Sequence, residues 1–144
     1  MRKIIFTRLD GGVSVVHPVR NTIGETLTTD AEIEQRAWNK LPEDAINPQF
    51  VEETAIPADR TFRNAWKVEA GSVAVDMGKA KDLTKDRLRI ERKPLLEAQD
   101  VAFQRALETG SSTVEIVKEK QRLRDVTKQV DALTSLDELK ALGL

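Results

Sequence analysis

The residues best suited to chemistry in this sequence are few and widely separated. The chain has one histidine, His17, beside Pro18 near the end of a predicted strand, and it has no cysteine. A metal site or a nucleophile–base pair would need further ligands or an activated nucleophile, and the sequence has no G-x-S-x-G elbow and no phosphate-binding loop. The carboxylates mostly alternate with basic residues, as on a solvated helix face. We therefore expect no catalytic residue, metal site or cofactor, and a structural or surface role for His17.

A basic stretch over residues 79–93 is the strongest local charge signal. It contains seven Lys or Arg residues against three acids. Such a stripe could follow the phosphates of a nucleic acid. It lacks aromatic side chains to stack on bases, however, so a solvated face or a surface for an acidic protein is the other interpretation. Four cations of this stretch recur every four residues and share one helix face, and we call them the basic stripe: Lys81, Lys85, Arg89 and Lys93.

A second cluster combines aromatic and guanidinium groups within residues 56–66, IPADRTFRNAW. Its two rings are four residues apart and its two arginines three apart, which fits one helical turn with an apolar side and a cationic side. Trp and Arg are enriched at interface hot spots, although buried rings with arginines that reach solvent are an alternative arrangement. Whether Trp66 belongs to the core or to an interface stays open. The candidate partner-binding residues are Arg60, Phe62, Arg63 and Trp66.

The elements that must position these residues change in type near residue 77. The first part, residues 1–77, reads as a small α+β domain. Asp-Gly and Gly-Gly pairs in residues 9–12 predict a tight turn between two β-branched runs. Thr29 and Glu32 have the spacing of a capping box, which predicts a helix that ends before Pro42. The remaining runs predict a strand over residues 49–56 and a second hairpin that turns at residues 70–72.

Residues 78–144 predict a helical hairpin followed by a short terminal helix. The first long helix should bend or restart at Pro94 and should end at Gly110. Capping boxes at Ser112 and Ser135 predict the starts of the next two helices. A connection as short as ETGSS returns the chain alongside itself, so the long helices should pair antiparallel. We expect this pairing to bring Leu95, Leu96, Val101 and Leu107 against Ile116, Val117, Leu123 and Val126.

Composition is typical of a soluble, helix-rich protein. Of the 144 residues, 40% are hydrophobic, 33% charged and 4% aromatic, and the net charge is −1. A balance this close to neutral argues against general electrostatic capture of nucleic acid or of an anionic membrane. No signal peptide and no membrane span are predicted, because no apolar run approaches about 18 residues.

Three stretches carry a resemblance to a known group of proteins. They are KIIFTRLDGGVSVVHP near the start, IPADRTFRNAW in the middle, and DRLRIERKPLLEAQDVAFQRALETG followed by KQRLRDVT. Together they resemble small proteins encoded in the tail-gene modules of tailed bacteriophages. The C-terminal part, with a basic helix, LRDVT and a short acidic-leucine end, is similar to phage tail-fibre assembly chaperones. The hairpin-first N-terminal half departs from the better-known fibre chaperones.

The resemblance implies a non-enzymatic tail component or tail-fibre assembly factor that works by protein–protein recognition. Its partner would be a phage tail or tail-fibre protein, and self-association into a homo-oligomer is compatible with it. The expected location is the virion tail, or the host-cell cytoplasm during assembly. Two alternatives stay open, which are a nucleic-acid-binding module that uses residues 79–93 and an enzyme of unknown type.

Overall fold

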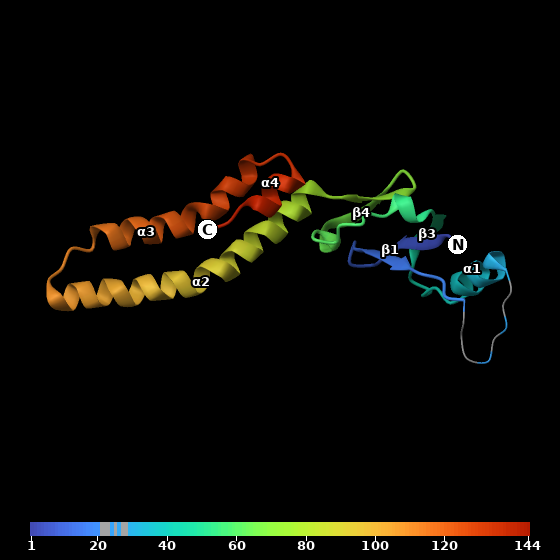
Figure 1. The fold of residues 1–144 in the computed structure, drawn as a ribbon, viewed down its shortest axis with the longest axis horizontal. Coiled ribbons are helices and arrows are strands. Elements are labelled where there is room, and N and C mark those ends of the chain that lie inside the picture. The colour runs from blue at the N-terminus through green and yellow to red at the C-terminus, as the bar shows by residue number, and fades with distance from the viewer. Residues whose placement is uncertain (21–23, 25, 27–28) are drawn as a thin grey trace. The chain divides into compact units, whose positions relative to one another are not determined.

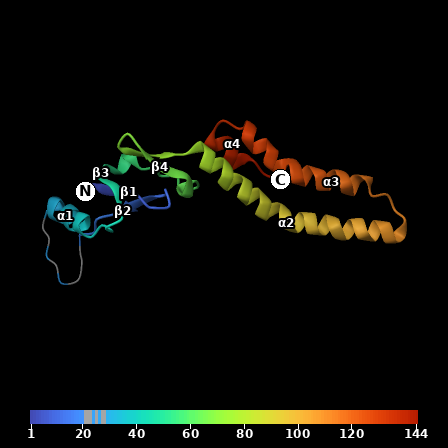
Figure 2. The same cartoon turned by 180° about the vertical axis from the view of Figure 1, so that it is seen from behind.

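The structure is a computed structural model that describes residues 1–20, 24, 26 and 29–144. It has a mixed α+β fold, 54% helical and 17% strand. A small antiparallel sheet with one helix comes first, and a long helix with further helices follows, which confirms the predicted fold class (Figure 1). The chain forms two compact units, Met1–Asp76 and Met77–Leu144, and the same elements are seen from behind in Figure 2.

The first unit is built on a three-stranded antiparallel sheet with the order β2-β1-β3. Strand β1 (Lys3–Thr7) pairs with β2 (Val13–Val16) through the predicted turn, in which Gly11 takes a φ of 81°. On its other side β1 pairs with β3 (Ile46–Val51). The strand predicted over residues 49–56 is therefore wrong beyond Val51. Because Val51 pairs with Lys3 at the start of β1, no strand continues beside the next residues, which form the 3-10 helix η1 (Glu53–Ala55).

Helix α1 (Asp30–Asn39) is joined to the sheet by a charged and an aromatic contact. The predicted capping box between Thr29 and Glu32 is present at its start. Glu34, only 6% exposed, accepts hydrogen bonds from the backbone N–H of Arg2 at 2.6 Å and from its guanidinium at 2.7 and 3.1 Å. The Trp38 ring stacks on Phe50 of β3, with 4.8 Å between the ring centroids. These contacts hold α1 against β1 and β3.

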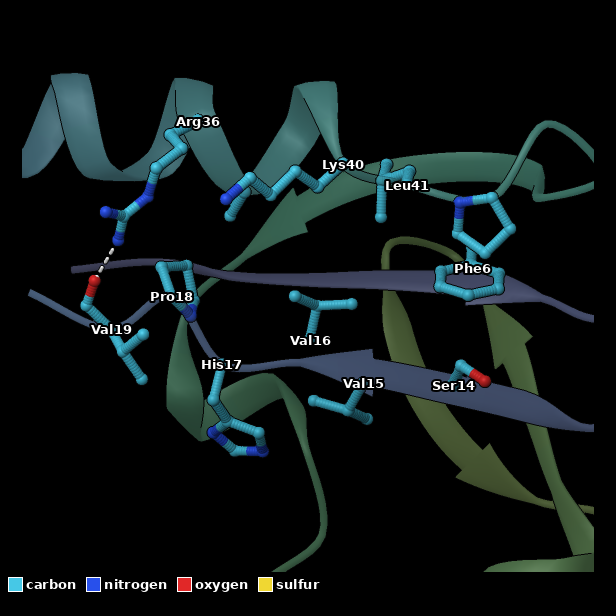
Figure 3. Close-up of a pocket in the computed structure, with 12 residues that line it drawn as sticks. Phe6, Ser14, Val15, Val16, His17, Pro18, Val19, Arg36, Lys40 and Leu41 are labelled. Carbon is cyan, nitrogen blue, oxygen red and sulfur yellow. Dashed lines mark hydrogen bonds between the residues drawn. The ribbon is translucent and has the colours of Figure 1, made fainter. Parts of the chain in front are cut away.

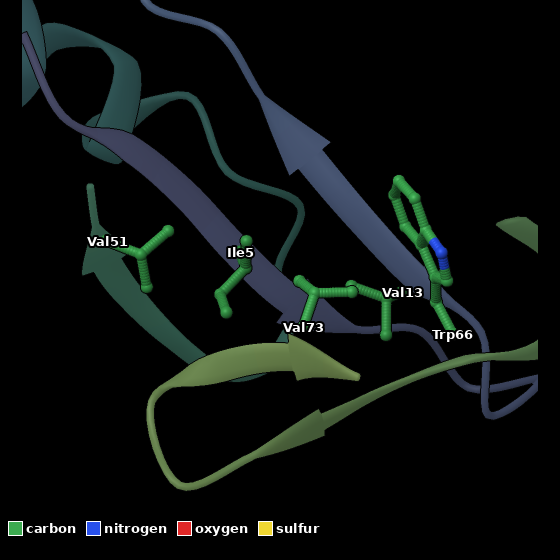
Figure 4. Close-up of a cluster of buried hydrophobic side chains, with 5 residues drawn as sticks. All are labelled: Ile5, Val13, Val51, Trp66 and Val73. Atoms are coloured by element: carbon green, nitrogen blue, oxygen red, sulfur yellow. The ribbon is translucent and has the colours of Figure 1, made fainter. Parts of the chain in front are cut away.

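The second predicted hairpin forms the apolar core with the opposite face of the sheet. It consists of β4 (Trp66–Glu69) and β5 (Ser72–Val75), which pair antiparallel. Its turn uses Ala70 and Gly71, both at positive φ, as the sequence predicts. Figure 4 shows the buried cluster that the hairpin and the sheet share: Ile5, Val13, Val51, Trp66 and Val73.

The second unit begins with α2 (Met77–Thr109), which contains Pro94 and changes direction midway along its length (Figure 1). The bend has a local cause, because proline cannot donate to the carbonyl four residues earlier and its ring clashes there. That carbonyl belongs to Ile90, which lies on the exposed side of the helix. Gly110 ends α2 with a φ of 67°, its N–H bonded to Leu107 O and that of Ser111 to Ala106 O. This is the glycine C-cap that the sequence predicts.

The chain returns along α2 as α3 (Val114–Asp125) and the 3-10 helix η3 (Val126–Ala132), and α4 (Leu136–Ala141) follows. The capping box expected at Ser112 does not form, because Thr113 is the N-cap residue and Ser112 Oγ accepts only from Val114 N–H. The cap expected at Ser135 is present, with its side chain bonded to Glu138 N–H.

The buried face of the hairpin differs from the expected one. Ala80, Thr84 and Leu88 recur every four residues on the inner side of α2, and Leu123 of α3 is buried with them in the second unit. Val101 lies on nearly the opposite side of α2 from Leu88, so it could not join this face. Four of the eight residues expected in the contact are instead substantially exposed: Leu95, Val101, Leu107 and Val117.

Truncating Leu123 should destabilise the protein strongly. Its side chain is 1% exposed, so Leu123→Ala removes buried contacts and leaves a cavity that costs about 2–5 kcal/mol of unfolding free energy. Val117→Ala, on the same helix at 49% exposure, is the matched control and should change stability by no more than about 0.5 kcal/mol. Urea denaturation followed by circular dichroism measures both. Equal effects of the two substitutions would contradict the placement of α3 on α2.

The ion pair between Arg2 and Glu34 should make the folding stability of the protein depend on pH in the acidic range. The hydrogen bonds from Arg2 lower the pKa of Glu34, so the pair stabilises the fold above the ordinary pKa of a glutamate and loses its effect as pH falls through the lowered value. Glu34→Gln should lower the thermal midpoint near neutral pH and flatten its fall between about pH 5 and pH 3. The exposed Glu43→Gln is the control. A parallel pH profile for wild type and Glu34→Gln would refute this role.

Candidate functional site

The segment that carries Arg60 and Arg63 consists of two tight turns. The Asp59 carboxylate accepts from Thr61 N–H at 2.9 Å and from its hydroxyl at 2.6 Å. Arg63 N–H then donates to Arg60 O at 3.0 Å, and the 3-10 helix η2 (Arg63–Ala65) leads into β4. The helical turn expected for this stretch is limited to the 3-10 turn of η2, because the chain becomes extended at Trp66. The two arginines project from successive turns of a hydrogen-bonded segment.

The two aromatic rings of this segment lie in the core of the first unit. Phe62 is 7% exposed and Trp66 2% exposed, and Trp66 belongs to the cluster shown in Figure 4. Of the two arrangements left open by the sequence, the structure has the one with buried rings. Arg60 and Arg63, in contrast, are both exposed. The rings thus anchor the segment, and only the guanidinium groups are presented to solvent.

Three cations lie near His17 and form a positive surface on the first unit. Burial lowers the pKa of His17, and the charges of Lys3, Arg60 and Arg63 lower it further, while Glu53 opposes them. Lys3 and His17 lie next to the paired residues Ile4 and Val16, and Arg60 lines a small pocket together with His17. Within the described residues, none of the three cations forms a salt bridge to a carboxylate. We call Lys3, Arg60 and Arg63 the cationic surface.

The cationic surface is suited to binding carboxylates. A guanidinium offers planar, bidentate hydrogen bonding to a carboxylate, and such charge-assisted bonds are stronger than neutral ones. The backbone of Arg60 and Arg63 is already ordered by the buried rings, which reduces the entropy lost on binding. The sequence analysis did not predict that Lys3 and His17 lie near each other. The strand register gives a signal for them, since Ile4 pairs with Val16 and the next positions outward are Lys3 and His17.

A separate pocket of about 420 Å³ lies between α1 and β2 (Figure 3). Apolar side chains, among them Phe6, Val16 and Leu41, form much of its lining. The Arg36 guanidinium donates to the Val19 carbonyl at its rim. His17 also belongs to the lining, and its imidazole points away from Val16 and α1 (Figure 3).

Within residues 1–20, 24, 26 and 29–144, no group of three or more His, Asp or Glu side chains is placed to hold a metal ion. None of the helices in this part of the chain combines the length and apolarity needed to cross a bilayer.

The basic stripe is largely engaged within the second unit. Lys81 donates to the Asp131 carbonyl at 3.1 Å, and Lys85 forms a salt bridge with the Asp131 carboxylate at 2.8 Å. Arg89 pairs with Asp86, one turn earlier on α2, at 2.7 Å. The fourth member, Lys93, is exposed directly before Pro94. Much of the charge that suggested phosphate binding therefore holds η3 against α2 or is neutralised along the helix.

Two arginines of α2 that the sequence did not single out bind main-chain oxygens. Arg87 donates to the carbonyls of Leu139 at 3.2 Å and Leu142 at 2.7 Å. Arg92 donates to those of Leu123 at 3.2 Å and Arg124 at 2.8 Å. The spacing carried a signal for Arg92, because it continues the four-residue recurrence of the buried face of α2.

Two substitutions separate anchoring from recognition in residues 56–66. Trp66→Ala should cost about 3–5 kcal/mol of unfolding free energy, since it empties a buried position. The double variant Arg60→Ala/Arg63→Ala should stay within about 0.5 kcal/mol of wild type per site, since both side chains are exposed. Denaturation curves of the two variants measure the difference. A stable Trp66→Ala protein would show that the ring does not anchor the segment.

Comparisons with protein-family models, with curated proteins and with solved structures found no match to this chain.

Proposed function

We propose that this protein is a non-enzymatic recognition protein of a bacteriophage tail module, either a tail component or a tail-fibre assembly factor. It binds an acidic segment of another tail or tail-fibre protein through the cationic surface. Its place of action is the virion tail, or the host-cell cytoplasm during assembly. The setting comes from the sequence resemblance, and the mode of binding comes from the exposure of Arg60 and Arg63 and from the place of Arg60 beside His17.

One observation carries the proposed mode of binding. Arg60 and Arg63 are exposed on a segment whose neighbouring rings are buried, and their side chains make no salt bridge within the described residues. Elsewhere in the chain many exposed arginines pair with carboxylates, as Arg122 does with Glu119 at 2.6 Å. Cations that the fold leaves unpaired favour a carboxylate partner from outside.

Nucleic-acid binding through residues 79–93 is the alternative, and it has less support. Lys81, Lys85 and Arg89 already have oxygen partners, so phosphate binding would have to break these interactions. Duplex DNA tests it directly, because binding through phosphates weakens steeply as the salt concentration rises. Such binding by the wild-type protein, at salt near the physiological level, would favour the alternative.

The proposed function predicts loss of partner capture without loss of folding. Tagged wild-type protein, co-expressed with the tail and fibre proteins encoded beside it, should retain a partner that Arg60→Ala/Arg63→Ala loses. Lys93→Ala/Arg105→Ala is the matched control, since it also removes two exposed positive charges and leaves the cationic surface intact. The measurement is the amount of partner that co-purifies at equal amounts of soluble tagged protein.

The reverse pattern would contradict the proposal. If Arg60→Ala/Arg63→Ala keeps its partner while Lys93→Ala/Arg105→Ala loses it, the binding surface lies on α2. A partner that both variants retain would place recognition on neither set of charges.

A further inference from the structure

A small pocket beside the cationic surface is lined by both His17 and Arg60. Its volume is about 140 Å³, and Glu53, Ile56, Pro57 and Ala58 complete its lining. His17 directly follows β2, Glu53 begins η1, and Arg60 belongs to the turn held by Asp59. Three separate segments of the first unit therefore build this pocket, which we call the His17 pocket.

The charges that act on His17 come from three segments of the first unit. Lys3 comes from β1, Glu53 from η1, and Arg60 and Arg63 from the segment before β4. Three cations thus oppose one carboxylate, and the excess positive charge attracts an anion. The apolar part of the lining would displace water from a bound group and strengthen its hydrogen bonds.

We propose that the His17 pocket seats one carboxylate side chain of the acidic partner segment, and that His17 takes up a proton when this carboxylate binds. Arg60 and the protonated imidazole both donate hydrogen bonds to the bound carboxylate. This inference rests on the proposed function, which supplies the acidic segment, and it adds a specific seat and a dependence on pH.

The electrostatics of the free protein favour such proton uptake. Burial and the three cations hold the pKa of free His17 below its ordinary value, so the imidazole is mainly neutral near pH 7. A carboxylate seated beside it supplies a negative charge and a hydrogen-bond acceptor, and both raise the pKa. Binding is therefore tightest below the pKa of the free protein and weakens as pH rises through the pKa of the complex.

The wall of the pocket favours a carboxylate over a phosphate. Glu53 contributes its own negative charge to the lining, which repels a dianion more strongly than a monoanion. Glu53 also raises the pKa of His17 in the free protein, so it already acts in the way proposed for the partner. Removing it should lower the pKa of free His17 and strengthen binding of an external carboxylate.

The chain's single histidine allows a direct test. In a proton–carbon correlation spectrum only one histidine Cε1–H signal is expected, and its shift against pH reports the pKa of His17. The titration is run on the full-length protein alone, with octaglutamate peptide, and with octaglutamine as the uncharged control. We expect octaglutamate to raise the pKa by about one unit and octaglutamine to leave it unchanged. The dissociation constant for octaglutamate should correspondingly fall about tenfold between about pH 8 and pH 5.5.

Variants assign the effect to the pocket. His17→Gln should bind octaglutamate with the weaker, high-pH affinity at every pH, because glutamine cannot titrate. Arg60→Ala should raise the pKa of free His17 and weaken binding, and Glu53→Gln should do the opposite on both counts. Lys93→Ala/Arg105→Ala should match wild type, and the dispersion of the amide spectrum checks folding in each case.

The outcomes separate this inference from the proposed function. If octaglutamate binds and needs Arg60 and Arg63, but the pKa of His17 does not move, the carboxylate seat is wrong and the proposed function stands. If octaglutamate does not bind at low salt near pH 5.5, the seat is also wrong, and co-purification of a tail partner then decides the proposed function separately. Equal competition by inorganic phosphate and by acetate would overturn the preference for a carboxylate.

Discussion

Hydrogen bonds from two arginines to main-chain oxygens join α2 to the helices that pack against it. Arg92 binds carbonyls in the last turn of α3, and Arg87 binds carbonyls at the end of α4. The ends of helices expose such oxygens without a partner and carry partial negative charge, so a guanidinium is well suited to them. The chain is only 4% aromatic, and these hydrogen bonds add to the apolar contacts that hold its helices together.

In the first unit one arginine also joins separate elements of the fold, whereas two others have no such structural role. Arg2 binds the buried Glu34 and lies over the Phe50 ring at 4.4 Å, so it joins β1, α1 and β3. Arg60 and Arg63 have no comparable task, because buried rings already fix their segment. A charge that the fold does not need can be used for recognition without loss of stability. Because the buried rings hold the segment in place, Arg60 and Arg63 are available to contact a partner.

Signals that act within one turn of chain could be predicted from the sequence, and those that depend on packing could not. The capping box at residues 29–32 and the glycine end at Gly110 are confirmed, because neighbouring atoms decide them. The inner face of α2 was misplaced, since it depends on where η3 and α4 dock and on the bend at Pro94. The exposure of Arg60 followed from its residue type. Its proximity to Glu53 did not, because that depends on how η1 folds back after β3 ends.

The distribution of buried residues along the hairpin gives it uneven local stability. Between residues 95 and 122 only Ala106 is buried, whereas Leu88, Leu123 and Val130 are buried where α2 meets η3 and α4. The free energy needed to open the far end of the hairpin is accordingly smaller than that of global unfolding, and amide protons there exchange with solvent through local opening. The local stability of the hairpin thus decreases from the end that contacts η3 and α4 toward the connection around Gly110.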